Sequence, residues 1–125
     1  MIERGDILEA KNRHKDAGLH YIIFYSGKDT RHFLGGMLTT SSEYEENIPM
    51  HKDHFETKDL DQHNYKIQYN NSHLVPAKLI KLESWRPFKI VGKLTKQGVE
   101  FVENHIDDLA EMLWEEYLVL RVVND

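Results

Sequence analysis

Histidine is the side chain in this sequence best suited to acid–base chemistry near neutral pH. The chain of 125 residues holds eight histidines and no cysteine, and seven of the histidines fall within residues 1–98. An unperturbed imidazole pKa of about 6.5 lets this side chain give or take a proton under physiological conditions. The absence of cysteine excludes disulfide-stapled folds, thiolate zinc sites, iron–sulfur sites and cysteine nucleophiles.

Metal binding is a second chemistry open to the histidines. His51 and His54 stand three residues apart, with Asp53 between them and His63 further along. Imidazole and carboxylate groups together suit zinc and other divalent ions. A lone His-x-x-His spacing is a weak signal, and no helix is predicted beneath it. We therefore predict no metal and no cofactor.

Arginines and aromatic residues supply candidates for binding phosphates and bases. The guanidinium groups of Arg31 and Arg86 suit phosphate oxygens, because a planar fork matches their geometry. Four rings could stack on unpaired bases, as in single-strand binders: Tyr44, Phe55, Tyr65 and Tyr69. Of these we single out Tyr44, with the two arginines, as candidates for contact with a nucleic acid.

Charge is distributed unevenly along the chain, whose formal net charge is −5. Residues 99–125 hold eight acidic residues against Arg121 alone, a net charge of −7. The first 98 residues hold 15 basic and 13 acidic residues, a net charge of +2. The overall acidity therefore does not argue against a nucleic-acid partner, and we expect any RNA strand to lie over residues 1–98.

Apolar and period-two patterns predict the strands that must position these side chains. They cover residues 6–10, 19–25, 31–40, 65–69, 72–82 and 88–94. The pair Gly35-Gly36 indicates a bulge or sharp bend. Pro76 must lie at an edge or bulge, because proline has no amide hydrogen to donate to a ladder.

A helix is predicted after the last strand, over residues 95–120, with Thr95 as its N-cap. Its apolar face follows steps of three and four residues: Val99, Val102, Ile106, Leu109, Leu113, Tyr117 and Leu120. The length fits one domain, residues 1–125, with a barrel over 1–94 and an irregular insert at about 42–64. The predicted fold is mostly β, a small antiparallel barrel with the C-terminal helix packed against it.

The apolar pattern also bears on location and assembly. No stretch approaches the roughly 18 apolar residues that a membrane span needs, and the first residues have no signal-peptide core. We therefore expect a cytoplasmic protein without membrane contact. Residues 118–123 are apolar on all sides, which offers surface for a subunit contact.

Several short motifs follow one another in a recognisable order. They are Arg4-Gly5-Asp6-Ile7-Leu8, Gly18 before the run Tyr21-Ile22-Ile23-Phe24-Tyr25-Ser26, Met37-Leu38-Thr39-Thr40-Ser41, Ser72-His73-Leu74-Val75 and Val91-Gly92-Lys93-Leu94-Thr95. Over roughly residues 3–115 this order resembles the PemK/Kid/MazF family of plasmid-maintenance and chromosomal mRNA-cleaving toxins.

The resemblance implies an SH3-like barrel, a homodimer, an antitoxin partner and metal-independent endoribonuclease activity on single-stranded RNA. Such cleavage needs a base for the 2′-hydroxyl, an acid for the leaving 5′-oxygen and a donor for the phosphorane charge. His20 aligns with an arginine of the family and becomes an acid–base candidate. Thr39 matches the family's strand-three threonine and would donate to the phosphate. His54, in the insert, is the second acid–base candidate.

The sequence departs from the family pattern at two places, and these keep other functions open. His20-Tyr21 stands where the family has Arg-Pro, and the insert at 42–64 is long and carries histidines. One alternative is a non-catalytic module on the same barrel that binds RNA, DNA or a protein. Another is a protein-interacting subunit that works through the helix over 95–120.

Overall fold

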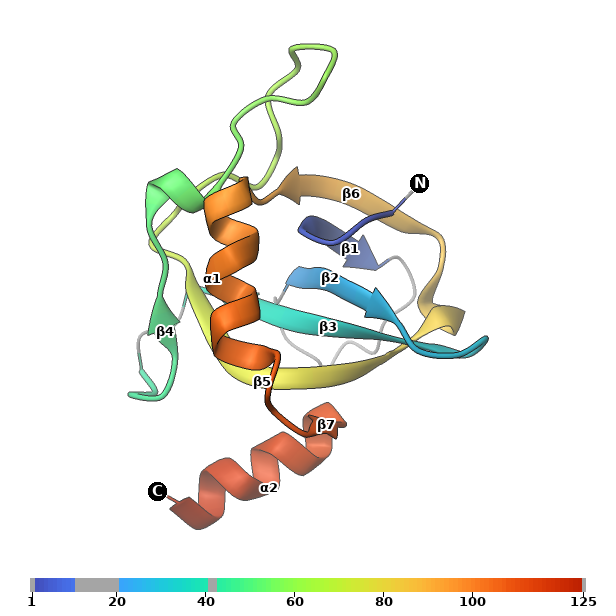
Figure 1. The fold of residues 1–125 in the computed structure, drawn as a ribbon, viewed down its shortest axis with the longest axis vertical. Coiled ribbons are helices and arrows are strands. Elements are labelled where there is room, and N and C mark those ends of the chain that lie inside the picture. Colours follow the sequence, from blue (N-terminus) through green and yellow to red (C-terminus); the bar gives the residue numbers. More distant parts are fainter. Residues whose placement is uncertain (1, 11–20, 41–42, 125) are drawn as a thin grey trace.

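A curved sheet of seven strands carries the fold (Figure 1). The computed structural model describes residues 2–10, 21–40 and 43–124, with side chains up to Arg121. The strands are β1 (Asp6–Ala10), β2 (Tyr21–Gly27), β3 (His32–Thr39), β4 (Ile48–Pro49), β5 (His73–Leu82), β6 (Phe88–Lys93) and β7 (Glu111–Met112). The helices are α1 (Lys96–Ile106) and α2 (Trp114–Asn124), with short 3-10 turns η2 (Lys52–His54) and η3 (Glu83–Trp85). The predicted mostly β class is confirmed.

The strands follow the order β4-β5-β3-β2-β1-β6, and each neighbouring pair on this path is antiparallel. The short β7 lies off this path and pairs in parallel with β5, through Lys78 with Glu111 and Leu79 with Met112. Neither α1 nor α2 has the length and hydropathy that a membrane crossing requires, so the described part of the chain holds no membrane-spanning helix.

Successive residues of β5 face two different apolar clusters, because side chains alternate across a strand. Leu74 belongs to the larger cluster, together with Ile106 of α1. Val75 belongs to a second cluster, together with Met37 of β3 and Tyr117 of α2. The helices α1 and α2 therefore pack on opposite sides of β5, as their places in Figure 1 also indicate.

The glycine pair and the proline lie where the ladders change register, as predicted. The β3–β5 pairing shifts between Gly35 and Met37, whose partners are Leu79 and Val75. Pro76 therefore falls inside the bulge and has no ladder bond to donate. A Cβ at Gly35 would lie 2.9 Å from the Ile22 side chain, so this position needs a residue without one.

The prediction of one helix over residues 95–120 is wrong, because α1 ends at Ile106 and α2 begins at Trp114. Between them the chain leaves the helix axis and pairs as β7 with the free edge of β5. This places Tyr117 in the second apolar cluster. Leu109 and Leu113, which the helical spacing assigned to the core, are exposed instead.

The prediction of a strand over residues 65–69 is also wrong, since this segment forms no ladder. It makes one strand-like bond, from the Ile67 amide to the Val91 carbonyl at 2.8 Å. The Glu56 amide donates to the Lys93 carbonyl at 2.9 Å, so the insert and the segment that follows it share the outer edge of β6. A Cβ at Gly92 would lie 2.8 Å from the Ile67 carbonyl oxygen, and glycine permits this crossing.

The insert is fastened to the start of α1. Thr95 is the N-cap, as predicted, and its hydroxyl accepts the Gly98 amide hydrogen at 3.1 Å. The same hydroxyl donates to the Asp53 carbonyl at 2.7 Å, and the Thr95 amide donates to the His54 carbonyl at 2.9 Å. These bonds and a close approach of Gly98 to His54 hold η2 against the first turn of α1.

Candidate functional site

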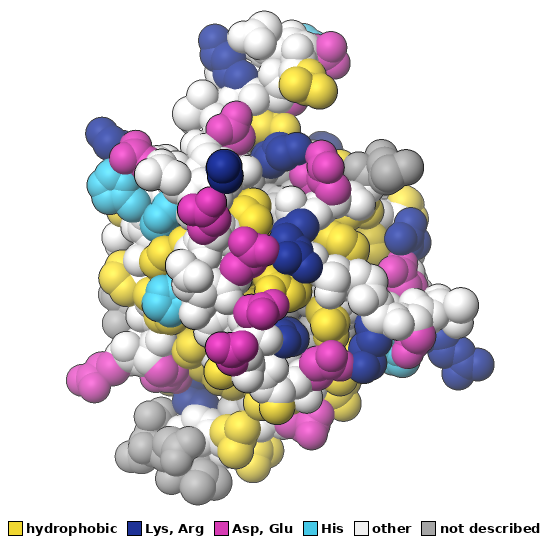
Figure 2. All heavy atoms as spheres, in the orientation of Figure 1, with side chains coloured by type: hydrophobic (Ala, Val, Ile, Leu, Met, Phe, Trp, Pro, Cys, Tyr) yellow, Lys and Arg dark blue, Asp and Glu magenta, His cyan; other side chains and the backbone are white. Residues whose placement is uncertain are grey.

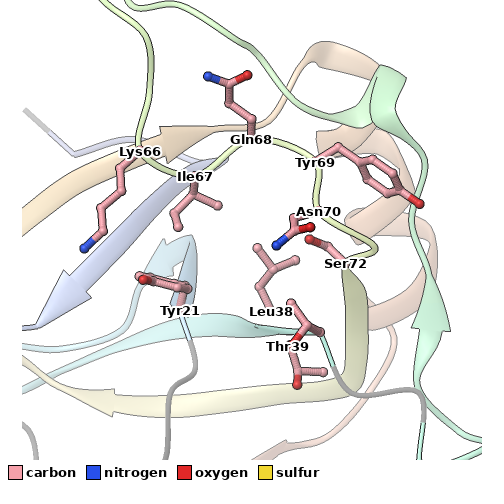
Figure 3. A pocket seen from close by; sticks show the side chains of 10 residues that line it. Tyr21, Leu38, Thr39, Lys66, Ile67, Gln68, Tyr69, Asn70 and Ser72 are labelled. Carbon is pink, nitrogen blue, oxygen red and sulfur yellow. The ribbon is translucent and has the colours of Figure 1, made fainter.

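A pocket of about 410 Å³ opens where the start of β2, the end of β3 and the segment before β5 meet (Figure 3). Ten residues line it: Tyr21, Leu38, Thr39, Thr40, Lys66, Ile67, Gln68, Tyr69, Asn70 and Ser72. Polar side chains such as Lys66, Gln68 and Asn70 stand beside apolar and aromatic ones, a mixture that also occurs in ligand pockets.

The floor of the pocket is apolar and continuous with the core. Leu38 belongs to the larger apolar cluster, and Tyr21 and Ile67 pack against it. In Figure 3 the side chains of Leu38 and Ile67 face the centre of the pocket from opposite sides. Tyr69 lies at the rim with 41% of its surface exposed, and its ring, 6.0 Å from the ring of Phe55, points away from the centre of the pocket in Figure 3.

Lys66 supplies the positive charge at the mouth. Its ammonium nitrogen lies 3.0 Å from the Glu9 carboxylate and 6.0 Å from the centre of the Tyr21 ring. The hydrogen bond with Glu9 raises the pKa of Lys66 and keeps the ammonium protonated. The side chain is exposed, so a phosphate can compete with Glu9 for it.

Buried polar side chains continue from the pocket wall into the sheet. Thr39 pairs with His73 across the β3–β5 ladder, which places their side chains next to each other on one face. His73 is 7% exposed, and its Nδ1 has no hydrogen-bond partner among the described residues. Ser72, the neighbour of His73, is buried and lines the pocket. This nitrogen is buried, and His73 is not among the residues that line the pocket, so its ring lies behind the pocket wall.

Of the six predicted site residues, Thr39 lines this pocket and His20 lies outside the described residues. Arg31 precedes the other end of β3, where its carbonyl accepts the Glu83 amide hydrogen at 2.8 Å. Arg86 pairs with the carboxylate of the same Glu83. The structure therefore separates both arginines from Thr39 by the length of β3.

Tyr44 and His54 each pack against a helix and not in the pocket. The Arg121 guanidinium of α2 lies 4.0 Å from the centre of the Tyr44 ring. The ring of His54 lies 4.5 Å from that of Phe101 in α1, and its Nδ1 accepts the His51 amide hydrogen at 2.9 Å. Both side chains thus have packing roles that the sequence pattern did not reveal.

Stability at mildly acidic pH is expected to fall more steeply in the wild type than in His54→Gln. Burial lowers the pKa of His54 below its usual 6.5, His51 adds to the lowering and Asp53 opposes it. The fold therefore favours the neutral ring, and this stabilisation is fully present above pH 6.5 and is lost as the pH falls below that value through the lowered pKa of the folded state. Glutamine can accept the same amide hydrogen but does not titrate.

Urea unfolding midpoints of both proteins, measured between neutral pH and about pH 5.5, test this linkage. Because the two proteins differ only at position 54, the difference between the two curves isolates His54. Parallel curves would show that protonation of His54 is not coupled to folding.

Three side chains of the insert could together hold a metal ion. Ligand atoms of Asp59, Asp61 and His63 lie within 4.8 Å of one another, on an exposed loop. Asp59 Oδ1 already accepts the amide hydrogens of Asp61 and His63, at 2.9 and 3.0 Å. The histidine pair of the sequence motif is arranged differently, because the Nδ1 atoms of His51 and His54 each accept a backbone hydrogen.

The sequence did not predict the residues that complete the pocket. Tyr21 reaches it at the start of β2 and Ser72 just before β5, and Lys66 reaches it because the segment after the insert crosses β6 at Gly92. The motif Ser72-His73 was noted in the sequence, but its position beside Thr39 follows only from the β3–β5 pairing. No family model, no curated protein and no solved structure matches this chain at a significant level, so the family resemblance stays a prediction.

Proposed function

We propose that this chain binds single-stranded RNA and that an unpaired nucleotide occupies the pocket lined by Thr39 and Lys66. The observation that carries the proposal is one cavity combining an apolar floor, two tyrosine rings and an exposed ammonium group. Its volume of about 410 Å³ falls within the range of small-molecule sites, roughly 300–1,000 Å³. A nucleotide in an unpaired strand presents a flat ring, polar edges and a phosphate to such a cavity.

Each part of a nucleotide has a matching group in the pocket. The Tyr69 ring can stack on a base, which contributes about 1–3 kcal/mol in single-strand binders. The Lys66 ammonium can take a phosphate oxygen. The Asn70 amide and the Ser72 hydroxyl, which point into the pocket in Figure 3, can bond base edges or the 2′-hydroxyl.

The distribution of charge supports this location. The segment with a net charge of −7 forms α1, β7 and α2, and none of these elements lines the pocket. Figure 2 shows acidic side chains gathered over one face of the molecule, the face on which α1 lies. A strand laid across the pocket thus avoids the acidic helices, which repel phosphate.

Fluorescence anisotropy with a labelled single-stranded RNA tests the proposal directly. We expect saturable binding that weakens as salt rises, because phosphate contacts release counterions. A double-stranded RNA of the same sequence is the control, and it should bind more weakly because its bases are stacked and paired. Equal affinity for both, or no binding to either, would contradict a pocket for an unpaired nucleotide.

Cleavage of the bound strand is the second candidate function, favoured by the unbonded Nδ1 of His73 beside Thr39. The reaction joins the 2′-oxygen to phosphorus and breaks the bond to the 5′-oxygen. His73 would accept the 2′-hydroxyl proton and then pass it to the leaving 5′-oxygen, and Thr39 would donate to the phosphate. The chain would then be the toxin-like endoribonuclease that the sequence resemblance implies.

His73→Asn is expected to abolish cleavage while retaining RNA binding, because asparagine does not exchange protons near neutral pH. Gel analysis of end-labelled RNA should show fragments ending in a 2′,3′-cyclic phosphate for the wild type alone. His32→Asn, at the opposite end of β3, is the matched control and should cleave normally. If the wild type leaves the RNA intact, the cleavage proposal is wrong and only the binding function remains.

The finer features implied by the resemblance belong to the same proposal. A barrel of the SH3-like kind is supported by the insert, which pairs Ile48 with Leu74 of β5 and Phe55 with Leu94 next to β6. A homodimer, an antitoxin partner and a cytoplasmic location follow from the sequence resemblance and patterns. Expression with and without a cognate antitoxin would test the toxin role in cells.

A further inference from the structure

A groove of about 560 Å³ lies on the far side of β5 from α1. It runs between α2, β7 and the segment before β4. Its walls are mainly apolar: Pro76, Ala77, Leu109, Met112, Tyr117 and Leu120. It shares no lining residue with the proposed RNA pocket.

The groove opens onto exposed apolar side chains. Four of the eight exposed large apolar side chains among the described residues lie here, and they are between 37% and 62% exposed: Leu109, Leu113, Val119 and Leu120. All four fall within the stretch that forms β7 and α2. Figure 2 shows apolar side chains at the surface at the end of the molecule where α2 lies, with acidic groups next to them. Apolar surface gathered in this way marks a contact site.

The rim of the groove is acidic. Glu45 and Glu46 line it, and Asp108, Glu111 and Glu116 stand next to its apolar residues in the sequence. The nearby cations are already engaged. Arg121 pairs with Glu46 at 2.8 Å, Lys28 pairs with Glu111, and the Lys78 ammonium bonds the Asp107 carbonyl. Glu46 and Glu111 are therefore paired, whereas Glu45, Asp108 and Glu116 have no cationic partner among the described residues, so the apolar groove keeps an acidic rim.

We propose that this groove binds an amphipathic helix of a partner protein, with lysine or arginine on both sides of an apolar stripe. An apolar helix face fills a groove of this kind through anchors spaced three and four residues apart. The carboxylates of the rim select basic flanks and speed the encounter. A second copy of this chain would bring the same acidic rim against itself, and an anionic membrane would be repelled.

The test uses the full chain and two synthetic amphipathic peptides with identical leucine positions, one with lysine and one with glutamate on the polar face. Anisotropy of the labelled lysine peptide should show saturable binding, and the glutamate peptide should not bind. Leu120→Ser should weaken binding about tenfold, the loss expected for one buried leucine anchor. Leu60→Ser is the matched control, because Leu60 is 99% exposed at the tip of the insert loop.

Three results would overturn the proposal. Equal binding by wild type and Leu120→Ser would mean that the lysine peptide is held by charge alone, outside the groove. Binding of the glutamate peptide would show that the acidic rim does not select basic partners. Sedimentation that shows a dimer, lost in Leu120→Ser, would assign the groove to a second copy. None of these measurements involves RNA, so failure of the RNA-binding proposal leaves this test unaffected.

Discussion

Replacement of Gly98 by alanine is expected to destabilise the fold by about 2–3 kcal/mol, the cost of forcing atoms into a packed site. The usual effect in a helix is the opposite, since alanine favours a helix over glycine by about 1 kcal/mol. In this fold a Cβ at position 98 would lie 2.2 Å from the carbonyl oxygen of His54. A backbone carbonyl cannot rotate away as a flexible side chain can, so η2 and α1 must move apart.

The direction of the change in the free energy of unfolding distinguishes the clash from the usual effect of alanine in a helix. Urea unfolding followed by circular dichroism gives the free energy of unfolding for each protein. Gly27→Ala is the matched control, because no atom lies within 4 Å of a Cβ at that position, and its change should stay within about 0.5 kcal/mol. A Gly98→Ala protein more stable than the wild type would mean that η2 does not rest on α1.

The double variant Lys66→Gln with Tyr69→Ala is expected to weaken single-stranded RNA binding by about 100-fold. Loss of base stacking on Tyr69 accounts for roughly 5- to 150-fold, the equivalent of 1–3 kcal/mol. Loss of Lys66 removes a phosphate contact and leaves the carboxylate of Glu9 facing the strand. The salt slope should also fall by about one phosphate contact. Anisotropy titrations at several salt concentrations measure both quantities.

Glu9→Gln gives an independent check with the opposite sign. Removing the carboxylate that now pairs with Lys66 frees the ammonium for phosphate, so RNA should bind more tightly.

Lys52→Gln, which removes an exposed lysine of η2, is the control for the loss of one positive charge in the double variant and should change affinity little. An unchanged affinity in the double variant would place any RNA site away from this pocket.

The strands could be predicted where the local pattern decides the structure. The first predicted strand matches β1 residue for residue, and the bulge at Gly35-Gly36 follows from the glycines themselves. The end of α1 could not be predicted, because Leu109 and Leu113 continue its spacing past the break. Only the open edge of β5 at Lys78 and Leu79 explains why the chain turns there into β7.

Of the residues that line the pocket, only Thr39 was predicted from the sequence. The others reach the pocket through contacts between distant parts of the chain, which a local pattern does not show. Thr39 belongs to a motif visible in the sequence, whereas Lys66 becomes part of the site because the segment after the insert crosses Gly92. His73 gains its position from strand register, which no local pattern records. Tyr44 and His54 have the right chemistry for the predicted roles, but packing against α2 and α1 occupies both.

The pairing of β1 with β6 has a consequence for the order in which the chain folds. Asp6 pairs with Lys93, so the first strand has no second neighbour until most of the chain has left the ribosome. The β2–β3 hairpin closes a short loop and can form early, on the order of microseconds. The closure of β1 on β6 must first overcome a large loop entropy, which places complete folding in roughly the millisecond-to-second range. Until then Ile7 and Leu8 remain exposed, and a nascent chain in this state is a natural client for chaperones.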